Sequence, residues 1–269
     1  MWLSGVGHSV GGMGYLSGGE LLSGCAHCCI DSNDHERKKS EMILIEERWA
    51  QLYKDVDRSM EFFAPRVDFA GSPSQDFEAC MEWSADLVMW ASDGESPEFA
   101  EFSVGYLRCT AVDLTRGEPV EEVFDALSAD LEVFCSAFDG GDVREDIQDQ
   151  FEAPFFGVLA LEVAEIAPPF RGHKLGAWLA AEVIARLAPY PYVLVLGYPH
   201  PFGPTFPEIT DKQAVGKLRR HWRHVGLEPL RGVSHLLGQS TERRNLHRAR
   251  SKLNSTVDSL KIQFEPKAS

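Results

Sequence analysis

The last third of the chain alternates strand-like and helix-like segments, and this order constrains the fold more than any other feature. Residues 155–166 and 192–197 are apolar runs typical of strands. Residues 173–187 and 211–225 place leucine, valine and alanine at helical spacing, and Gly226 closes the second helix before a final strand. The order strand, helix, strand, helix, strand predicts an α/β fold with a mixed central β-sheet flanked by helices.

The segments before residue 155 are less distinctive. Residues 102–114 are rich in β-branched and aromatic side chains and predict a strand. Residues 118–138 predict a helix with Pro119 in its first turn. Between residues 46 and 90, hydrophobic side chains at helical spacing predict two further helices.

The first 41 residues differ in composition from the rest. They are rich in glycine and polar side chains, and bury too little apolar surface to offset the entropy of ordering. We therefore predict that residues 1–41 form a poorly ordered Gly-rich extension, with Met42 as the candidate start of the folded unit. We expect the folded domain to span residues 42–238, and residues 239–269 to form a basic polar tail with weak structure.

Charge is distributed unevenly along the chain. The 269 residues carry a formal net charge of −15, with the acidic excess in residues 41–165 and a basic excess in residues 166–269. Either the two halves attract each other within one domain, or the basic part holds a polyanionic ligand. Because the whole chain would be repelled by a phosphate backbone, nucleic acid is not an expected partner.

No segment predicts a membrane span or a signal peptide. No run approaches the roughly 18 apolar residues of a spanning helix, and no basic stretch at the N-terminus precedes an apolar one. We expect a cytoplasmic protein without a membrane partner.

Three of the six cysteines cluster in Cys25-Ala-His-Cys28-Cys29. A Cys-x-x-Cys pair can bind zinc, but a structural zinc site usually needs a second such pair, which the sequence lacks. We therefore expect reduced thiols and no metal site.

The segment from Arg171 to Gly176 lies between a predicted strand and a predicted helix. A helix N-terminus offers unpaired backbone N–H groups and a positive dipole end, which favour phosphate. Gly172 and Gly176 let a ligand approach the backbone, and Arg171 and Lys174 add positive charge. These residues predict a diphosphate cradle, and close packing of the helix on its strand is the alternative explanation for the glycines.

Residues 166–176 read Ile-Ala-Pro-Pro-Phe-Arg-Gly-His-Lys-Leu-Gly and are followed by an amphipathic helix, a short strand and a helix ending in Trp222-Arg-His-Val-Gly-Leu227. This arrangement resembles the GNAT superfamily of acyl-CoA-dependent N-acyltransferases, most clearly over residues 155–230. The resemblance implies a GNAT-like fold, with acetyl-CoA or another acyl-CoA as co-substrate. The family motif is Arg/Gln-x-x-Gly-x-Gly/Ala, so Lys174 stands where the family commonly has its first glycine.

The resemblance also implies where acyl-CoA would bind. Backbone N–H groups of the loop would hold the diphosphate, and the backbone of the preceding strand would pair with the pantetheine arm as an added strand does. The strand at 162–166 would diverge from that at 192–197, leaving the thioester in the gap. The residues so implied are Ala164, Glu165, Ile166, Arg171, Gly172, His173, Lys174, Leu175 and Gly176.

Proton transfer is the other requirement of the implied reaction, in which an amine attacks the thioester. Trp222 replaces the family's thiolate-protonating tyrosine, and its indole N–H is too weak an acid for that role. His221, His224 or a water molecule would substitute, and His221 is our candidate acid, although a basic helix face also explains both histidines. Glu162 and Glu165 are the candidate bases. Strand alternation predicts that they lie on opposite faces, and we favour Glu162.

We predict an N-acyltransferase, with acetyl as the expected acyl group and a small-molecule or protein amine of unknown identity as acceptor. The alternative is a catalytically inactive GNAT-like module that binds acyl-CoA or a protein partner. An RNA-linked amine is a third hypothesis, which rests only on the basic C-terminal third. A second copy of the chain is a candidate partner in a homodimer.

Overall fold

The computed structural model describes residues 59–95, 99–201 and 211–265. Its centre is a sheet of eight strands in the order β10-β1-β2-β3-β6-β7-β9-β8. β6 and β7 pair in parallel and every other neighbouring pair is antiparallel, so the sheet is mixed as predicted. The strands are β1 (Met60–Pro73), β2 (Cys80–Ser92), β3 (Ala100–Asp113), β6 (Gly157–Ile166), β7 (Val193–Gly197), β8 (Glu228–Leu230), β9 (Val233–Ser240) and β10 (Lys261–Phe264).

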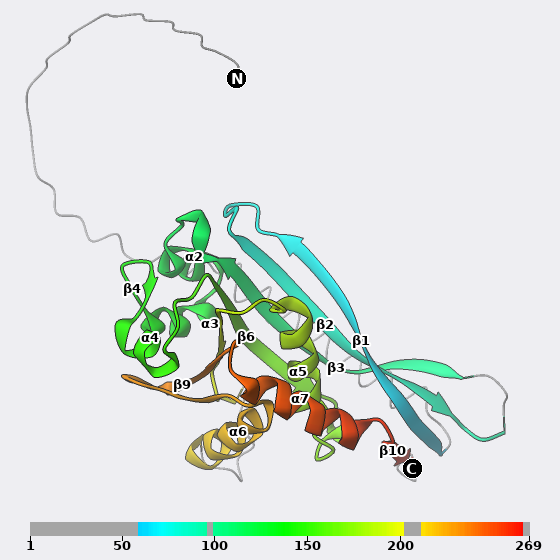
Figure 1. The fold of residues 1–269 in the computed structure, drawn as a ribbon. Helices are drawn as coiled ribbons and strands as arrows, with labels where there is room; N and C mark the ends of the chain where they lie inside the picture. The colour runs from blue at the N-terminus through cyan, green and yellow to red at the C-terminus, as the bar shows by residue number, and fades with distance from the viewer. Residues whose placement is uncertain (1–58, 96–98, 202–210, 266–269) are drawn as a thin grey trace, which may run out of the picture.

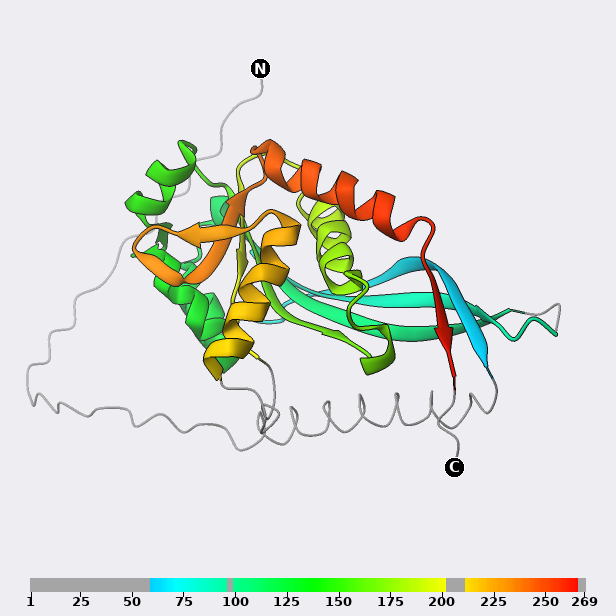
Figure 2. The same cartoon turned by 90° about the horizontal axis from the view of Figure 1, so that it is seen from below.

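Helices cover both faces of this sheet, which confirms the predicted α/β architecture (Figure 1). One face packs against α5, α6 and α7, and Figure 2 shows α5 lying between α7 and the sheet. The other face packs against α2, α3 and α4. The helices are α2 (Val120–Leu127), α3 (Ala129–Glu132), α4 (Glu145–Phe151), α5 (Leu175–Leu187), α6 (Asp211–Val225) and α7 (Arg244–Val257), with a small ribbon of β4 (Phe138–Asp139) and β5 (Asp142–Val143).

Each face has its own hydrophobic core. The first core joins Leu107 and Leu159 of the sheet to Leu179 of α5. The second joins Val158 and Ala160 of β6 to Phe124 of α2. Alternate residues of β6 therefore feed opposite cores, which explains why this strand reads as a continuous apolar run.

The helices predicted between residues 46 and 90 are wrong for the part that the structure describes. Residues 60–73 and 80–92 are strands β1 and β2. In β2 the buried residues Ala85, Leu87, Met89 and Ala91 recur at every second position, which is the period of a strand. Their spacing also matches parts of a helical pattern, and pairing on both sides within the sheet decides between the two. The part of this prediction before residue 59 lies outside the described residues.

The single helix predicted over 118–138 is divided at Ser128. This residue is extended (φ −167°, ψ 150°), and its hydroxyl accepts a hydrogen bond from the backbone N–H of Leu131. It thus ends α2 and caps α3, as serine commonly does at a helix N-cap.

The prediction of weak structure after Gly238 is also wrong. β9 continues to Ser240, and α7 and β10 follow it. α7 buries Leu246, Leu253 and Val257 along one stripe, and β10 pairs with the start of β1. A few apolar residues at the right spacing anchor this segment although its average composition is basic and polar. Residues 1–41 and Met42, the predicted extension and candidate start, lie outside the described residues.

None of the described helices combines the length and the apolar character needed to cross a membrane.

Candidate active site

β6 and β7 separate at the point where the sequence places the gap. Their parallel pairing runs from Gly157 opposite Val193 to Leu161 opposite Gly197. β6 continues to Ile166, beyond its last partner on β7, while its other edge stays paired with β3. The stretch from Glu162 to Ile166 therefore presents a sheet edge to the gap, and Ala164, Glu165 and Ile166 all lie on it.

A β-bulge interrupts β6 at Glu162. Cys109 of β3 pairs with Leu161 and Arg108 pairs with Val163, so Glu162 is the extra residue. The extra residue shifts the alternation of every later side chain by one position.

The bulge brings Glu162 and Glu165 to the same face of the sheet. The hydroxyl of Thr110 on β3 donates to Glu162 Oε1 at 2.6 Å, and the hydroxyl of Tyr106 donates to Glu165 Oε2 at 3.4 Å. Tyr106 and Thr110 are four residues apart on one strand and share a face. The prediction that the two glutamates face opposite sides is therefore wrong.

Glu162 has an environment suited to proton exchange. Burial raises the pKa of its carboxyl above the ordinary value, and the nearby acidic groups Glu82 and Asp130 add to this rise. The hydrogen bond from Thr110 and the charge of Arg108 oppose it. A carboxylate with a raised pKa accepts a proton more readily than an exposed glutamate does near neutral pH.

Arg171 binds back onto the end of β6. Its Nε donates to the carbonyl oxygen of Ile166 at 2.7 Å, and its guanidinium lies 3.7 Å from the carboxylate of Glu165. Phe170, fully buried one residue earlier, anchors the same turn in the core. The guanidinium of Arg171 therefore ties the loop to the strand, and only its remaining N–H groups are left for a ligand.

The loop before α5 contains two residues in left-handed conformations. Gly172 has φ +90° and Lys174 has φ 62°. A left-handed backbone conformation favours glycine, so the backbone at Lys174 has the conformation expected for the glycine of the motif. Lys174 occupies the N-cap of α5, makes no side-chain capping bond and is exposed. The loop thus keeps an open helix N-terminus despite the lysine.

The first turn of α5 meets α6 and the end of β6 at Gly176. A Cβ atom on Gly176 would lie 3.1 Å from Nε2 of His221 and 3.3 Å from Cγ1 of Ile166. Burial lowers the pKa of His221, and the charge of His224 lowers it further. The neutral imidazole can donate one hydrogen bond to a thiolate but has no imidazolium proton to give. The acid role of His221 therefore stays a prediction, with water as its alternative.

The other loop residues differ in what they offer. Leu175 is buried in the core, so only its backbone faces outward, and the side chain of His173 is partly exposed. Trp178 and Trp222 are core residues. His200 stacks on Tyr198 with ring centroids 5.3 Å apart, beyond the end of β7.

Sequence reasoning missed the contribution of β3. Tyr106, Arg108 and Thr110 surround the two glutamates only because β3 pairs with β6 across the bulge. The sequence identifies both strands but carries no signal for this register. No group of side chains suited to a metal ion occurs among the described residues, and the cluster at Cys25 lies outside them.

Comparison with known proteins returns only distant matches. No family model and no curated protein matches the chain. The chain is similar to a crystal structure of Arabidopsis thaliana NAA60 in complex with acetyl-CoA, with a TM-score of 0.33 and 10% identity over 66% of this chain and 100% of that one. It is also similar to the same protein in complex with a bisubstrate analogue, with a TM-score of 0.30 and 11% identity over 72% and 91%.

Proposed function

We propose that the chain is an acyl-CoA-dependent N-acyltransferase of the GNAT type, which transfers an acyl group, with acetyl the expected one, to an amine. One observation carries this proposal. β6 leaves its partner β7 and leads through a short loop into the open N-terminus of α5, while a partly buried glutamate lies beside the gap.

The loop before α5 fits a diphosphate. The backbone N–H groups of the first helical turn and the helix dipole favour an anion there. A Cβ atom at Gly172 would meet nothing within 4 Å, so the described residues leave open space beside the backbone. Lys174 is exposed at the same point and adds a positive charge. The resemblance assigns the diphosphate of acyl-CoA to this loop, from Arg171 to Gly176.

The free edge of β6 fits the pantetheine arm. Residues 164–166 are paired on one side with β3 and extend beyond the last residue of β7 on the other. An extended amide-containing chain can hydrogen-bond to such an edge as an added strand. Acyl-CoA would then lie on the α5 side of the gap with its thioester between the two strands.

The amine would approach from the opposite face, where Glu162 lies. Bound acyl-CoA supplies an activated carbonyl carbon. Glu162 would accept a proton from the ammonium, the freed amine nitrogen would bond to the carbonyl carbon, and the carbon–sulfur bond would break. The second proton of the bonded nitrogen would pass through a water molecule to the departing thiolate, to which the neutral His221 would donate a hydrogen bond. The acidic groups around Glu162 favour a cationic acceptor on electrostatic grounds.

A non-catalytic acyl-CoA-binding module is the second candidate. It is favoured by the departures from the family motif. Trp222, in place of the tyrosine, is buried in the core, and His221 is held neutral. Such a module would retain the loop and the strand edge but lack an efficient acid.

Acetyl-CoA binding and thiol release together test the proposal. Calorimetry with acetyl-CoA should give saturable heat, and Lys174→Glu should weaken binding by about tenfold because it places a negative charge beside the diphosphate. Lys252→Glu, an exposed change on α7, is the matched control and should leave binding unchanged. The absence of heat with the wild-type chain would refute the proposal.

Turnover separates the two candidates. The chain is mixed with acetyl-CoA and, in turn, with spermidine, an aminoglycoside, a lysine peptide and a peptide with a free N-terminus. Free thiol should accumulate with at least one of these amines. Gly176→Trp should abolish this release because the new side chain would meet His221 and Ile166. Gly216→Trp is the control, since a Cβ at that position meets nothing within 4 Å. Saturable binding without turnover on any amine would favour the binding module.

A further inference from the structure

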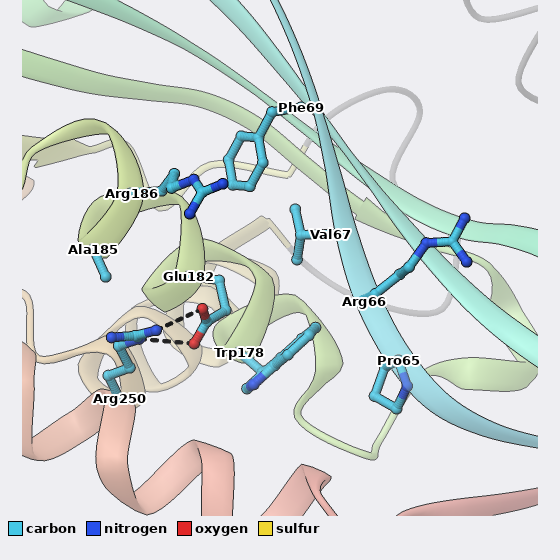
Figure 3. A pocket seen from close by; sticks show the side chains of 9 residues that line it. All are labelled: Pro65, Arg66, Val67, Phe69, Trp178, Glu182, Ala185, Arg186 and Arg250. Atoms are coloured by element: carbon cyan, nitrogen blue, oxygen red, sulfur yellow. Dashed lines mark hydrogen bonds and ion pairs between the residues drawn. The ribbon is translucent and has the colours of Figure 1, made fainter.

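A pocket lies on the face of the sheet that carries α5 and α7. It has a volume of about 510 Å³ and is bounded by residues 65–69 of β1, by α5 and by Arg250 of α7 (Figure 3). β10 pairs with β1 only from Met60 to Phe63, so no described strand covers the outer edge of β1 alongside the pocket. A cavity of this size is in the range that holds a small organic molecule.

Apolar side chains line one part of the pocket. Val67 and Phe69 alternate on β1 and both face α5. Trp178 forms part of the opposing wall, and its indole N–H donates to Asn254 Oδ1 at 2.8 Å. A flat apolar group could therefore contact Phe69 and Trp178, and the hydrogen bond to Asn254 holds the indole of Trp178 in place.

Two of the three arginines at the pocket are already neutralised. Arg66 points away from it and pairs with Glu101, with both nitrogen–oxygen distances at 2.6 Å (Figure 3). Arg250 makes a bidentate ion pair with Glu182, with both nitrogen–oxygen distances at 2.8 Å. The charges of these side chains are therefore balanced within the chain.

Arg186 is the cation that remains. Its guanidinium carbon lies 5.9 Å from the ring centroid of Phe69, and no carboxylate among the described residues pairs with it. It is exposed, and Figure 3 shows it beside Phe69 at the end of the pocket. An anionic group placed there would gain a charge-assisted pair without displacing an existing one.

We propose that this pocket binds a small organic carboxylate with a flat apolar body. The carboxylate pairs with Arg186, and the apolar body packs between Phe69 and Trp178 against Val67. The site is separate from the proposed acyl-CoA site, because it lies between β1 and the part of α5 from Trp178 to Arg186, and no residue of the loop 171–176 lines it.

Titration of the full chain with 2-naphthoate, followed by the ¹⁵N indole resonances, tests the site. The Trp178 resonance, identified by its loss in Trp178→Phe, should shift saturably. The neutral analogue 2-naphthamide should bind at least tenfold more weakly, and added salt should weaken 2-naphthoate because the pair with Arg186 is exposed.

Arg186→Gln should weaken 2-naphthoate binding by about tenfold, whereas Arg231→Gln, an exposed arginine outside the pocket, should not. An unshifted Trp178 resonance, equal binding of the amide, or unchanged binding by Arg186→Gln would each overturn the proposal. The outcome does not depend on whether the chain is an acyltransferase.

Discussion

Replacing Glu162 by glutamine should stabilise the fold and at the same time remove the proposed base. The carboxyl group has a raised pKa because it is withdrawn from water. Glutamine is nearly the same size, has no charge to bury, and keeps an oxygen that can accept the 2.6 Å hydrogen bond from Thr110. Stability and activity should therefore change in opposite directions, which a general disruption of the site would not produce.

The raised pKa gives the sign of the stability effect and its pH dependence. Because the folded pKa of Glu162 is raised above 4.5, the folded state binds its proton more tightly than the unfolded state does. Its favourable contribution is complete below about pH 4.5 and is lost as the pH rises through the folded pKa. Each tenfold difference in proton affinity is worth about 1.4 kcal/mol. Urea unfolding of both chains between pH 4.5 and 8 should show the advantage of Glu162→Gln growing with pH and then levelling off.

Turnover of the same variant should fall by about 10²- to 10⁴-fold, or roughly 3 to 5 kcal/mol in activation free energy, if Glu162 takes the proton. Thr110→Val is the companion change. It removes a hydrogen bond that favours the charged form, so the acidic limb of the pH–rate profile should move to higher pH. A Glu162→Gln chain that gains no stability between pH 4.5 and 8 would refute the burial argument, and one with full turnover would refute the base.

Three further changes test other parts of the structure. Lys174→Gly should raise the unfolding free energy by about 0.5 to 1 kcal/mol in thermal melts, because the left-handed backbone suits glycine, whereas Lys217→Gly inside α6 should lower it by about 1 kcal/mol. The lowered pKa of His221 means that the unfolded state binds its proton first, so the wild-type chain should lose stability as the pH falls below about 6.5. His221→Gln should abolish this part of the loss. Thermal melts of both chains at pH 5.5 and 7.5 measure it, and an equal difference in stability between the two pH values in both chains would contradict it. Ser128→Ala should cost about 1 kcal/mol in urea unfolding through loss of the cap on Leu131, and an unaltered midpoint would argue against that cap.

Elements with an uninterrupted local pattern were predictable. The ends of β6, β7, α5 and α6 all lie within two residues of the predicted bounds. The loop before α5 was predictable as well, because glycine and the change from strand to helix periodicity mark it in the sequence. Its left-handed Lys174 is a local backbone property that the motif implies.

Elements stabilised by distant partners were not predictable. The hydrophobic spacing of β1 and β2 fits two periods, and only their pairing with β3 and β10 selects the strand. α7 and β10 have a polar average composition, and their few apolar residues are buried only because they pack against α5 and β1.

By itself, the amino-acid sequence determined the order of strands and helices in the last third and the helix N-terminus that opens at Lys174, since these follow from interactions between residues close in the chain. The tertiary structure decided which side chains share the candidate site. A single extra residue at Glu162 brings Glu165 to the same face, and the pairing of β6 with β3 places Thr110 and Tyr106 beside them. Strand register arises from contacts between residues some fifty positions apart, and hydrophobic periodicity within one strand contains no information about them.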